Sequence, residues 1–200
     1  MAELTWPRNR IPKNYISIEL VGCGDASQKI ACAVCYARVL REDNTYSCHL
    51  LLAKTKIVPE GMSLPRAELM ACTLNVHITE IVKKSLKRLP IKNCTYVLDS
   101  EIALHWIASE TKRLIPGARN QVIEIKRFST IDEWVHVASE WNPADLGTRK
   151  GVKIEDVSAE SEWAVGLQWM RQPWNELLGT QLKNVSDVKL KNEYLVGAKI

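Results

Sequence analysis

The feature that most restricts the fold of this chain is a change of hydrophobic period near residue 60. Before it, three segments with strand-like patterns follow one another at residues 15–24, 30–40 and 45–57, joined by short polar links. The first alternates apolar and polar residues, and the second is an apolar run typical of a strand covered on both faces. Since links this short join antiparallel neighbours, we predict that the three strands form an antiparallel meander.

After residue 60 the apolar positions recur with helical spacing. Ser63 and Pro65 are helix start signals and Pro90 is a stop signal, so a long amphipathic helix is predicted over residues 64–88. The segments that follow are a strand at 94–99, helices at 100–110 and 118–129, and a strand at 133–138. This order predicts an α/β fold with a five-stranded mixed sheet, in which parallel strands add to the antiparallel three and helices cover both faces.

Composition excludes several classes of protein. The chain is 46% hydrophobic and 25% charged, which is typical of a globular domain and argues against disorder. No apolar run is long enough to span a membrane and residues 1–15 lack the apolar stretch of a secretory signal, so we expect no membrane partner. The six cysteines lie in apolar or alternating segments, which favours buried thiols over a disulfide framework. The net charge of +4 permits a polyanionic partner without requiring one.

Four carboxylates lie at positions that are not explained by an ordinary role as solvated surface charges. Asp25 and Asp99 come at the ends of predicted strands, Glu68 lies in the first turns of the long helix beside its apolar stripe, and Asp145 follows Asn142-Pro143 after the last strand. If the first and fourth strands are neighbours, their carboxyl ends meet at one edge of the sheet, where α/β folds place their sites.

Carboxylates gathered at one edge repel one another, and their pKa values rise unless cations neutralise them. Oxygen ligands alone favour hard cations, namely Mg²⁺ or Mn²⁺. Two such ions can stabilise both the attacking and the leaving oxygen of a phosphodiester displacement. The residues therefore point to a two-metal hydrolase of nucleic acid as one hypothesis.

Longer segments around these acids resemble a known family. The order Asp, Glu, Asp, Asp after a three-stranded start resembles the metal-binding tetrad of the ribonuclease H fold. The segments Leu64–Leu69, Leu98–Ile107 and Trp141–Arg149 are similar to the ribonuclease H region of BEL/Pao-type LTR retrotransposon polyproteins. Asp25-Ala26-Ser27 resembles the first acidic motif of that family, and the tryptophan-rich stretch 163–174 resembles its link toward integrase.

The resemblance implies an endonuclease that hydrolyses the RNA strand of RNA·DNA hybrids during reverse transcription. Carried over residue by residue, the metal ligands and catalytic residues are Asp25, Glu68, Asp99 and Asp145, with two Mg²⁺ ions, or Mn²⁺, as cofactors. Substrate contacts are expected at Ser27, Ser100 and Asn120. The histidine that cellular members carry before the last aspartate is absent from the short loop Ala138–Trp141, and His136 is expected to pack on its strand.

The same resemblance divides the chain into three parts. Residues 1–14 are expected to be a connection segment, 15–150 the ribonuclease H-like domain, and 151–200 a tryptophan-containing extension. It also implies partners and a location: an RNA·DNA hybrid, the reverse transcriptase and integrase regions of one polyprotein, and an intracellular site, either a cytoplasmic virus-like particle or the nucleus.

Two other interpretations remain open at this stage. One is a catalytically silent module with the same fold, host-recruited or structural, that binds nucleic acid or protein. The other is a transposase or integrase core on the same fold. The second is disfavoured because the acids of such cores follow the chain order Asp, Asp, Glu, whereas here Glu68 comes between the first two aspartates. The spacings along the tetrad are 43, 31 and 46 residues.

Overall fold

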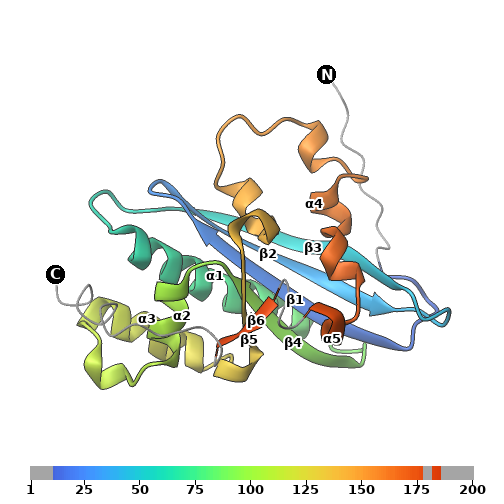
Figure 1. Cartoon of the computed structure of the whole chain (residues 1–200), viewed down its shortest axis with the longest axis horizontal. Coiled ribbons are helices and arrows are strands. Elements are labelled where there is room, and N and C mark those ends of the chain that lie inside the picture. Colours follow the sequence, from blue (N-terminus) through green and yellow to red (C-terminus); the bar gives the residue numbers. More distant parts are fainter. Residues whose placement is uncertain (1–10, 178–181, 186–200) are drawn as a thin grey trace.

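The computed structural model describes residues 11–177 and 182–185 and contains one mixed sheet (Figure 1). The strands are β1 (Ser17–Ala26), β2 (Ile30–Leu40), β3 (Tyr46–Ile57), β4 (Ile91–Leu98), β5 (Trp134–Val137) and β6 (Leu182–Asn184). Their order across the sheet is β3-β2-β1-β4-β5-β6. The first three strands pair antiparallel, and β4 and β5 add in parallel, as predicted.

The sixth strand is a correction to the five-stranded prediction. β6 pairs antiparallel with β5 at the far edge of the sheet, with Val137 opposite Leu182. Only three residues long, β6 lies in a stretch whose sequence pattern is too short to identify it as a strand. The expected connection segment 1–14 lies mostly outside the described residues, as does the end of the extension from residue 186 onward.

Three helices cover one face of the sheet. They are α1 (Leu64–Ser85), α2 (Glu101–Ala108) and α3 (Pro116–Lys126). Pro65 occupies the first turn of α1 as predicted, whereas the Ser63 side chain makes no capping hydrogen bond, and the helix ends at Ser85 rather than 88. Among the described residues, no helix is both long and apolar enough to cross a membrane.

Glycines in β1 let α1 lie close to the sheet. A Cβ atom at Gly22 would lie 2.2 Å from Oδ1 of Asn75, and one at Gly24 would lie 3.2 Å from the carbonyl oxygen of Ala71. A side chain at Gly22 would clash with Asn75, and one at Gly24 would crowd the backbone of α1. The close approach therefore sets the height of α1 above the central strand.

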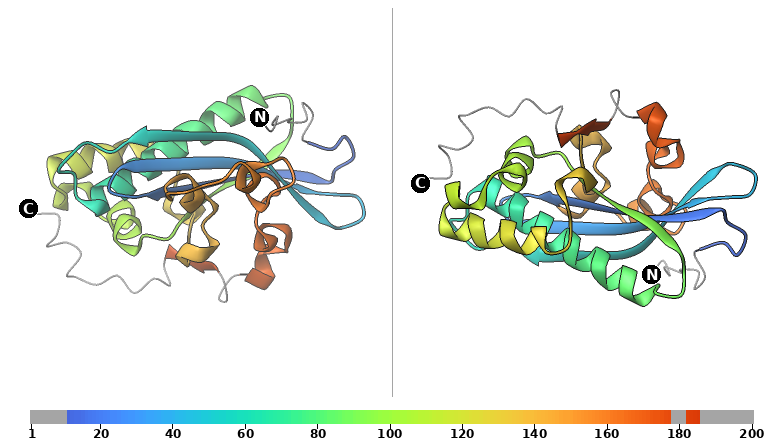
Figure 2. Two further views of the ribbon diagram at one scale, coloured as in Figure 1. Left: turned by 90° about the horizontal axis from the view of Figure 1, so that it is seen from above. Right: turned by 90° about the horizontal axis from the view of Figure 1, so that it is seen from below.

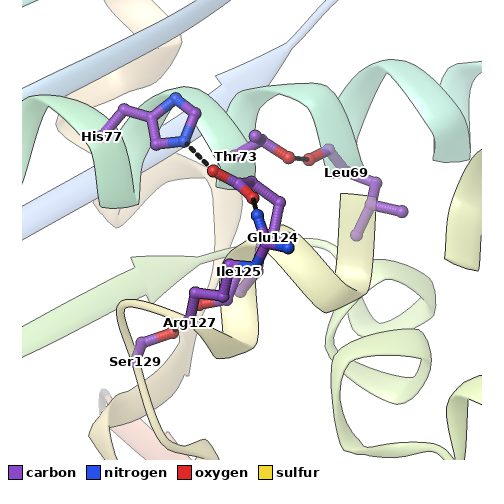
Figure 3. Close-up of polar contacts among 7 residues, drawn as sticks. All are labelled: Leu69, Thr73, His77, Glu124, Ile125, Arg127 and Ser129. Carbon is purple, nitrogen blue, oxygen red and sulfur yellow. Dashed lines mark hydrogen bonds and ion pairs between the residues drawn. The ribbon is translucent and has the colours of Figure 1, made fainter. Parts of the chain in front are cut away.

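α1 and α3 are also joined at the surface (Figure 3). Nε2 of His77 lies 3.0 Å from Oε1 of Glu124, whose other oxygen accepts a hydrogen bond from Arg127 at 2.7 Å. The His77 ring meets Phe128 edge-on with ring centroids 5.3 Å apart. Because Arg127 is exposed and His77 is partly exposed, we expect these contacts to align the two helices while contributing little stability.

The opposite face of the sheet is covered by short helices from the end of the chain (Figure 2). These are α4 (Glu162–Val165), the 3-10 helix η6 (Gln168–Arg171) and α5 (Trp174–Leu177). Their apolar side chains pack on Val21, Val34 and Tyr36 of the sheet. Helices therefore lie on both faces, as predicted, but Pro173 and Gly166 divide the second layer into single turns.

All six cysteines are buried and free, in agreement with the expectation of core thiols. Burial raises the pKa of Cys32 and of Cys35 to about 12. These thiols are therefore neutral at physiological pH and behave as small apolar side chains.

A buried ion pair attaches the second layer to the sheet. Arg38 and Glu19 face each other across β1 and β2, and Arg38 is 1% exposed. Nη1 of Arg38 donates to Glu19 at 2.5 Å, Nε donates to the carbonyl of Met170 at 2.9 Å, and Nη2 donates to the carbonyl of Gln172. The indole of Trp174 also donates to Glu19 at 2.8 Å. The charges are thus paired and also bonded to the covering segment.

We expect Arg38→Met to destabilise the protein by about 3–5 kcal/mol, because it leaves Glu19 charged and buried without its partner. The same substitution at Arg127, whose side chain is 67% exposed, should cost less than about 0.5 kcal/mol. Urea unfolding of both variants and the parent measures the difference. Similar, small losses from the two substitutions would contradict a structural role for the buried pair.

Candidate acidic site at the sheet edge

The parallel pairing of β1 and β4 brings two of the four acids to one level. Cys23 pairs with Val97, and Asp25 and Asp99 each follow two residues later. Asp25 is 8% exposed and is the last but one residue of β1, where it pairs with Cys32 of β2. It therefore lies inside the strand rather than after it. The prediction that the first and fourth strands are neighbours is therefore confirmed.

Glu68 and Asp145 reach the same region from different elements. Glu68 lies on α1 one turn before Ala71, whose backbone lies against Gly24. Asp145 lies in the 3-10 helix η4 (Pro143–Gly147), which begins with Pro143 after the N-cap Asn142. The charge of Asp25 interacts with the charges of Asp99 and Asp145. The charge of Glu68 interacts with those of Asp99 and Asp25.

Each of the four carboxylates has a donor from the protein. Thr148 donates a hydrogen bond to Oδ2 of Asp25, and Ser100 donates one to Oε2 of Glu68. Nδ2 of Asn142 donates to Oδ1 of Asp99 at 3.1 Å. Arg149 forms an ion pair with Oδ2 of Asp145. These contacts satisfy buried oxygens that would otherwise be costly to remove from water.

Two of the four acids have raised pKa values. Burial raises the pKa of Asp25 to about 6, with repulsion from Asp99 and Asp145 adding to the rise and the Thr148 hydrogen bond opposing it. Burial likewise raises the pKa of Glu68 to about 7, opposed by Ser100 and reinforced by Asp99 and Asp25. Such shifts indicate a site where a cation would relieve stored repulsion.

The donor set fits a hard divalent cation in its chemistry but is not drawn together around one. Within residues 11–177 and 182–185, no three His, Cys, Asp or Glu side chains are close enough to hold a metal ion. In this arrangement each carboxylate contacts a separate donor, and Asp145 pairs with Arg149. Loading would require Asp145 to exchange Arg149 for the cation and the acids to draw closer together.

The expected substrate contacts have different surroundings. The hydroxyl of Ser27 accepts hydrogen bonds from the backbone N–H of Lys29 and Ile30, at 3.3 and 3.1 Å, so it shapes the β1–β2 turn. Ser100 caps α2 by accepting from Ala103 N–H while its hydroxyl contacts Glu68. Asn120 is exposed on α3. Of the three, Ser100 is the one bonded to an acid of the site.

Sequence reasoning missed the roles of two residues near the last aspartate. Thr148 and Arg149 bond to Asp25 and Asp145, although both belong to the segment Trp141–Arg149 that carries the resemblance. Their signal was the similarity of that whole segment, since neither residue type in isolation indicates a site. His136 is half-buried on β5, with Nε2 3.1 Å from the carbonyl oxygen of Asp99.

The raised pKa of Asp25 has a consequence for stability. Because the folded-state value of about 6 exceeds the ordinary 3.8, ionising Asp25 costs stability as the pH rises through this interval. Asp25→Asn mimics the protonated form and keeps an oxygen for Thr148. In metal-free buffer, its stabilising effect should therefore be larger at pH ~7.5 than at pH ~4.5, by about 2 kcal/mol.

Urea unfolding at the two pH values with a chelator measures this difference. Asp43→Asn is the control, because the hydrogen bond from Thr45 lowers the pKa of the exposed Asp43 below its ordinary 3.8, so the effect of this substitution should differ little between the two pH values. A gain from Asp25→Asn that is equal at both pH values would show that the pKa of Asp25 is not raised.

Solved structures with a similar backbone include several ribonucleases H. The N-terminal RNase H domain of a Mycobacterium tuberculosis protein matches 63% of this chain and 86% of its own, at 12% identity and a TM-score of 0.42. RNase H1 from Halobacterium salinarum covers 64% of this chain and 90% of its own, at 12% identity and a TM-score of 0.39. LC11-RNase H1 isolated from compost covers the same shares at 17% identity and 0.41. A comparison with curated protein sequences finds no match.

The sequence itself gives the family. Residues 1–100 match the family model described as "Pao retrotransposon-like RNaseH-like domain", a region that includes Asp25, Glu68 and Asp99. The strand order, three antiparallel strands followed by parallel additions, is that of the ribonuclease H-like fold expected from the resemblance. This chain belongs to the Pao retrotransposon-like RNaseH-like domain family.

Proposed function

We propose that this chain is a divalent-metal endonuclease that hydrolyses the RNA strand of RNA·DNA hybrids during reverse transcription of a retrotransposon. The observation that supports it most directly is the burial of Asp25 and Glu68 beside other carboxylates at one sheet edge, where burial first and repulsion second raise the pKa of both. Family membership supports the reaction class, and a net charge of +4 is compatible with a nucleic-acid partner.

In this proposal Asp25, Glu68, Asp99 and Asp145 hold two Mg²⁺ ions, or Mn²⁺. When bound, such ions supply a nucleophile from water and stabilise the developing charge on the phosphate oxygens. The 2′-hydroxyl of the RNA strand distinguishes it from the DNA strand.

The surrounding residues orient the acids. Ser100 holds one oxygen of Glu68 and Thr148 one oxygen of Asp25, which leaves the second oxygen of each carboxylate for the cation. Asn142 directs Asp99 and is itself held by the carbonyl of Gly24 at 2.8 Å. Arg149 must release Asp145 for the full set of four to assemble. Outer partners of this kind fix ligand geometry in metal sites.

The polyprotein context is part of the same proposal. We propose that the reverse transcriptase and integrase regions of one polyprotein are its neighbours, with the extension after residue 150 directed toward integrase. Action in a virus-like particle or in the nucleus would follow from that context.

A catalytically silent module is the second candidate. The ion pair between Asp145 and Arg149 favours it, because a site that lacks its fourth ligand binds cations weakly. In that case the domain would bind nucleic acid or protein without cleaving it.

Cleavage of a labelled RNA·DNA hybrid in Mg²⁺ or Mn²⁺ tests the proposal. We expect metal-dependent loss of the RNA strand, and Asp99→Asn should lower the rate by more than about a hundredfold, since even outer partners of ligands cost 10–100-fold. The matched control is Asp132→Asn, which changes an exposed aspartate in the 3-10 helix before β5.

Calorimetric titration with Mn²⁺ separates the two candidates. Binding without cleavage would favour the silent module with an intact acidic site. Neither binding nor cleavage would reject the metal-dependent enzyme. Cleavage that survives Asp99→Asn unchanged would show that another site is responsible.

A further inference from the structure

The segment that covers the second face of the sheet is bonded to it at several points. We define residues 163–174 as the C-terminal strap. The hydroxyl of Tyr36 donates to the carbonyl of Trp163 at 2.8 Å, and Arg38 donates to the carbonyls of Met170 and Gln172. Figure 2 shows this part of the chain on the side of the sheet opposite α1 and α3. The strap is therefore a fixed layer of the domain.

One side chain of the strap reaches toward the acidic site. Trp169 is 1% exposed, and its indole Nε1 donates to the carbonyl of Trp141 at 3.0 Å. Trp141 is the last residue of a single 3-10 turn, Ser139–Trp141, and directly precedes Asn142. A single 3-10 turn has few internal hydrogen bonds and is easily displaced, so an outside partner has a large effect on it.

Asn142 connects that turn to the acids. It is 3% exposed, and its Oδ1 accepts from the backbone N–H of Ala144 at 3.1 Å as the cap of η4. Its Nδ2 donates both to the carbonyl of Gly24 and to Oδ1 of Asp99. The same side chain thus fixes the start of the helix that carries Asp145 and one oxygen of Asp99.

We propose that Trp169 is a positioning residue for the acidic site, which it acts on through Trp141 and Asn142. The strap, anchored by Arg38, holds the 141–149 segment in place and so sets Asp145 relative to Asp99. This inference rests on the proposed function for its catalytic meaning, but the positional coupling is a property of the metal-free protein. It makes the tryptophan-rich extension a part of the site's support.

Trp169→Phe tests the coupling, because it keeps an aromatic ring in the core while removing the indole N–H together with part of the ring volume. The matched control is Trp174→Phe, which removes an indole N–H in the same strap that bonds to Glu19 at 2.8 Å instead of to the site segment. Asn142→Ala is the positive control, because it removes the last link of the chain of contacts.

The first readout is amide hydrogen exchange of the metal-free full chain. The amides to follow are those of Asp145, Thr148 and Arg149, which donate backbone hydrogen bonds within η4 and its C-terminal turn. In Trp169→Phe they should exchange about five- to tenfold faster, the change expected when one stabilising hydrogen bond is lost. Amides of β1 and β2 should be unchanged, Trp174→Phe should leave the site segment as in the parent, and Asn142→Ala should reproduce the local effect.

The second readout is Mn²⁺ affinity by calorimetric titration. We expect Trp169→Phe to weaken binding by about tenfold, the lower end of the range for outer partners of metal ligands. Trp174→Phe should bind Mn²⁺ like the parent. A purely structural role for Trp169 would leave this affinity unchanged once the protein is folded.

Three results would overturn the inference. One is exchange at the site segment that does not change in Trp169→Phe, and another is an equal change in both tryptophan variants. The third is a uniform rise across the sheet, which would assign Trp169 to the core alone. A failure of the proposed function alone would give a different result. The parent would neither cleave the hybrid nor bind Mn²⁺, while Trp169→Phe would still show faster exchange at the site segment.

Discussion

The parallel pairing of β1 with β4 is the contact on which the arrangement of this domain depends. It joins the antiparallel meander to the second half of the chain and sets Asp25 level with Asp99 through the Cys23–Val97 register. A shift of one residue in that pairing would turn one of the two acids to the opposite face. The close approach of α1 over Gly22 and Gly24 depends on the same central strand and carries Glu68 to the same edge.

The concentration of acids at this edge opposes folding. Asp25 and Glu68 are buried near other carboxylates, and both have raised pKa values for that reason. The protein offsets the cost with a separate donor for each acid, and each donor belongs to an element that packs nearby. Sites that keep unfavourable charge together in this way are typical of function, since a core chosen for stability alone would exclude them.

The second face of the sheet is covered by single helical turns from residues 162–177. Arg38 of the buried Arg38–Glu19 pair bonds to backbone carbonyls of this segment. An apolar side chain at position 38 could fill the space but could not orient three carbonyl and carboxylate groups at once. The ion pair thus selects one placement of the strap, and Trp169 extends that placement to the loop before Asp145.

Much of this structure could be predicted from the pattern of residues. The period change near residue 60 predicted the meander and α1, and strand-end acids predicted where Asp25 and Asp99 would meet, because periodicity and strand direction are local properties of the chain. The strand β6 and the pairing of Arg38 with Glu19 could not be predicted from these patterns. Three residues are too few for a periodic signal, and Arg38 stands inside an apolar run that gives no sign of its partner.

The sequence by itself determined the fold class and the order of the strands from β1 to β5, and it singled out the four acids as candidates. Only the tertiary structure decided which donors Asp25, Glu68 and Asp99 receive and how the tryptophan-rich segment lies on the sheet. The physical reason is that these contacts join residues up to 155 positions apart, as between Trp174 and Glu19, where the partner is chosen by three-dimensional packing rather than by neighbours along the chain.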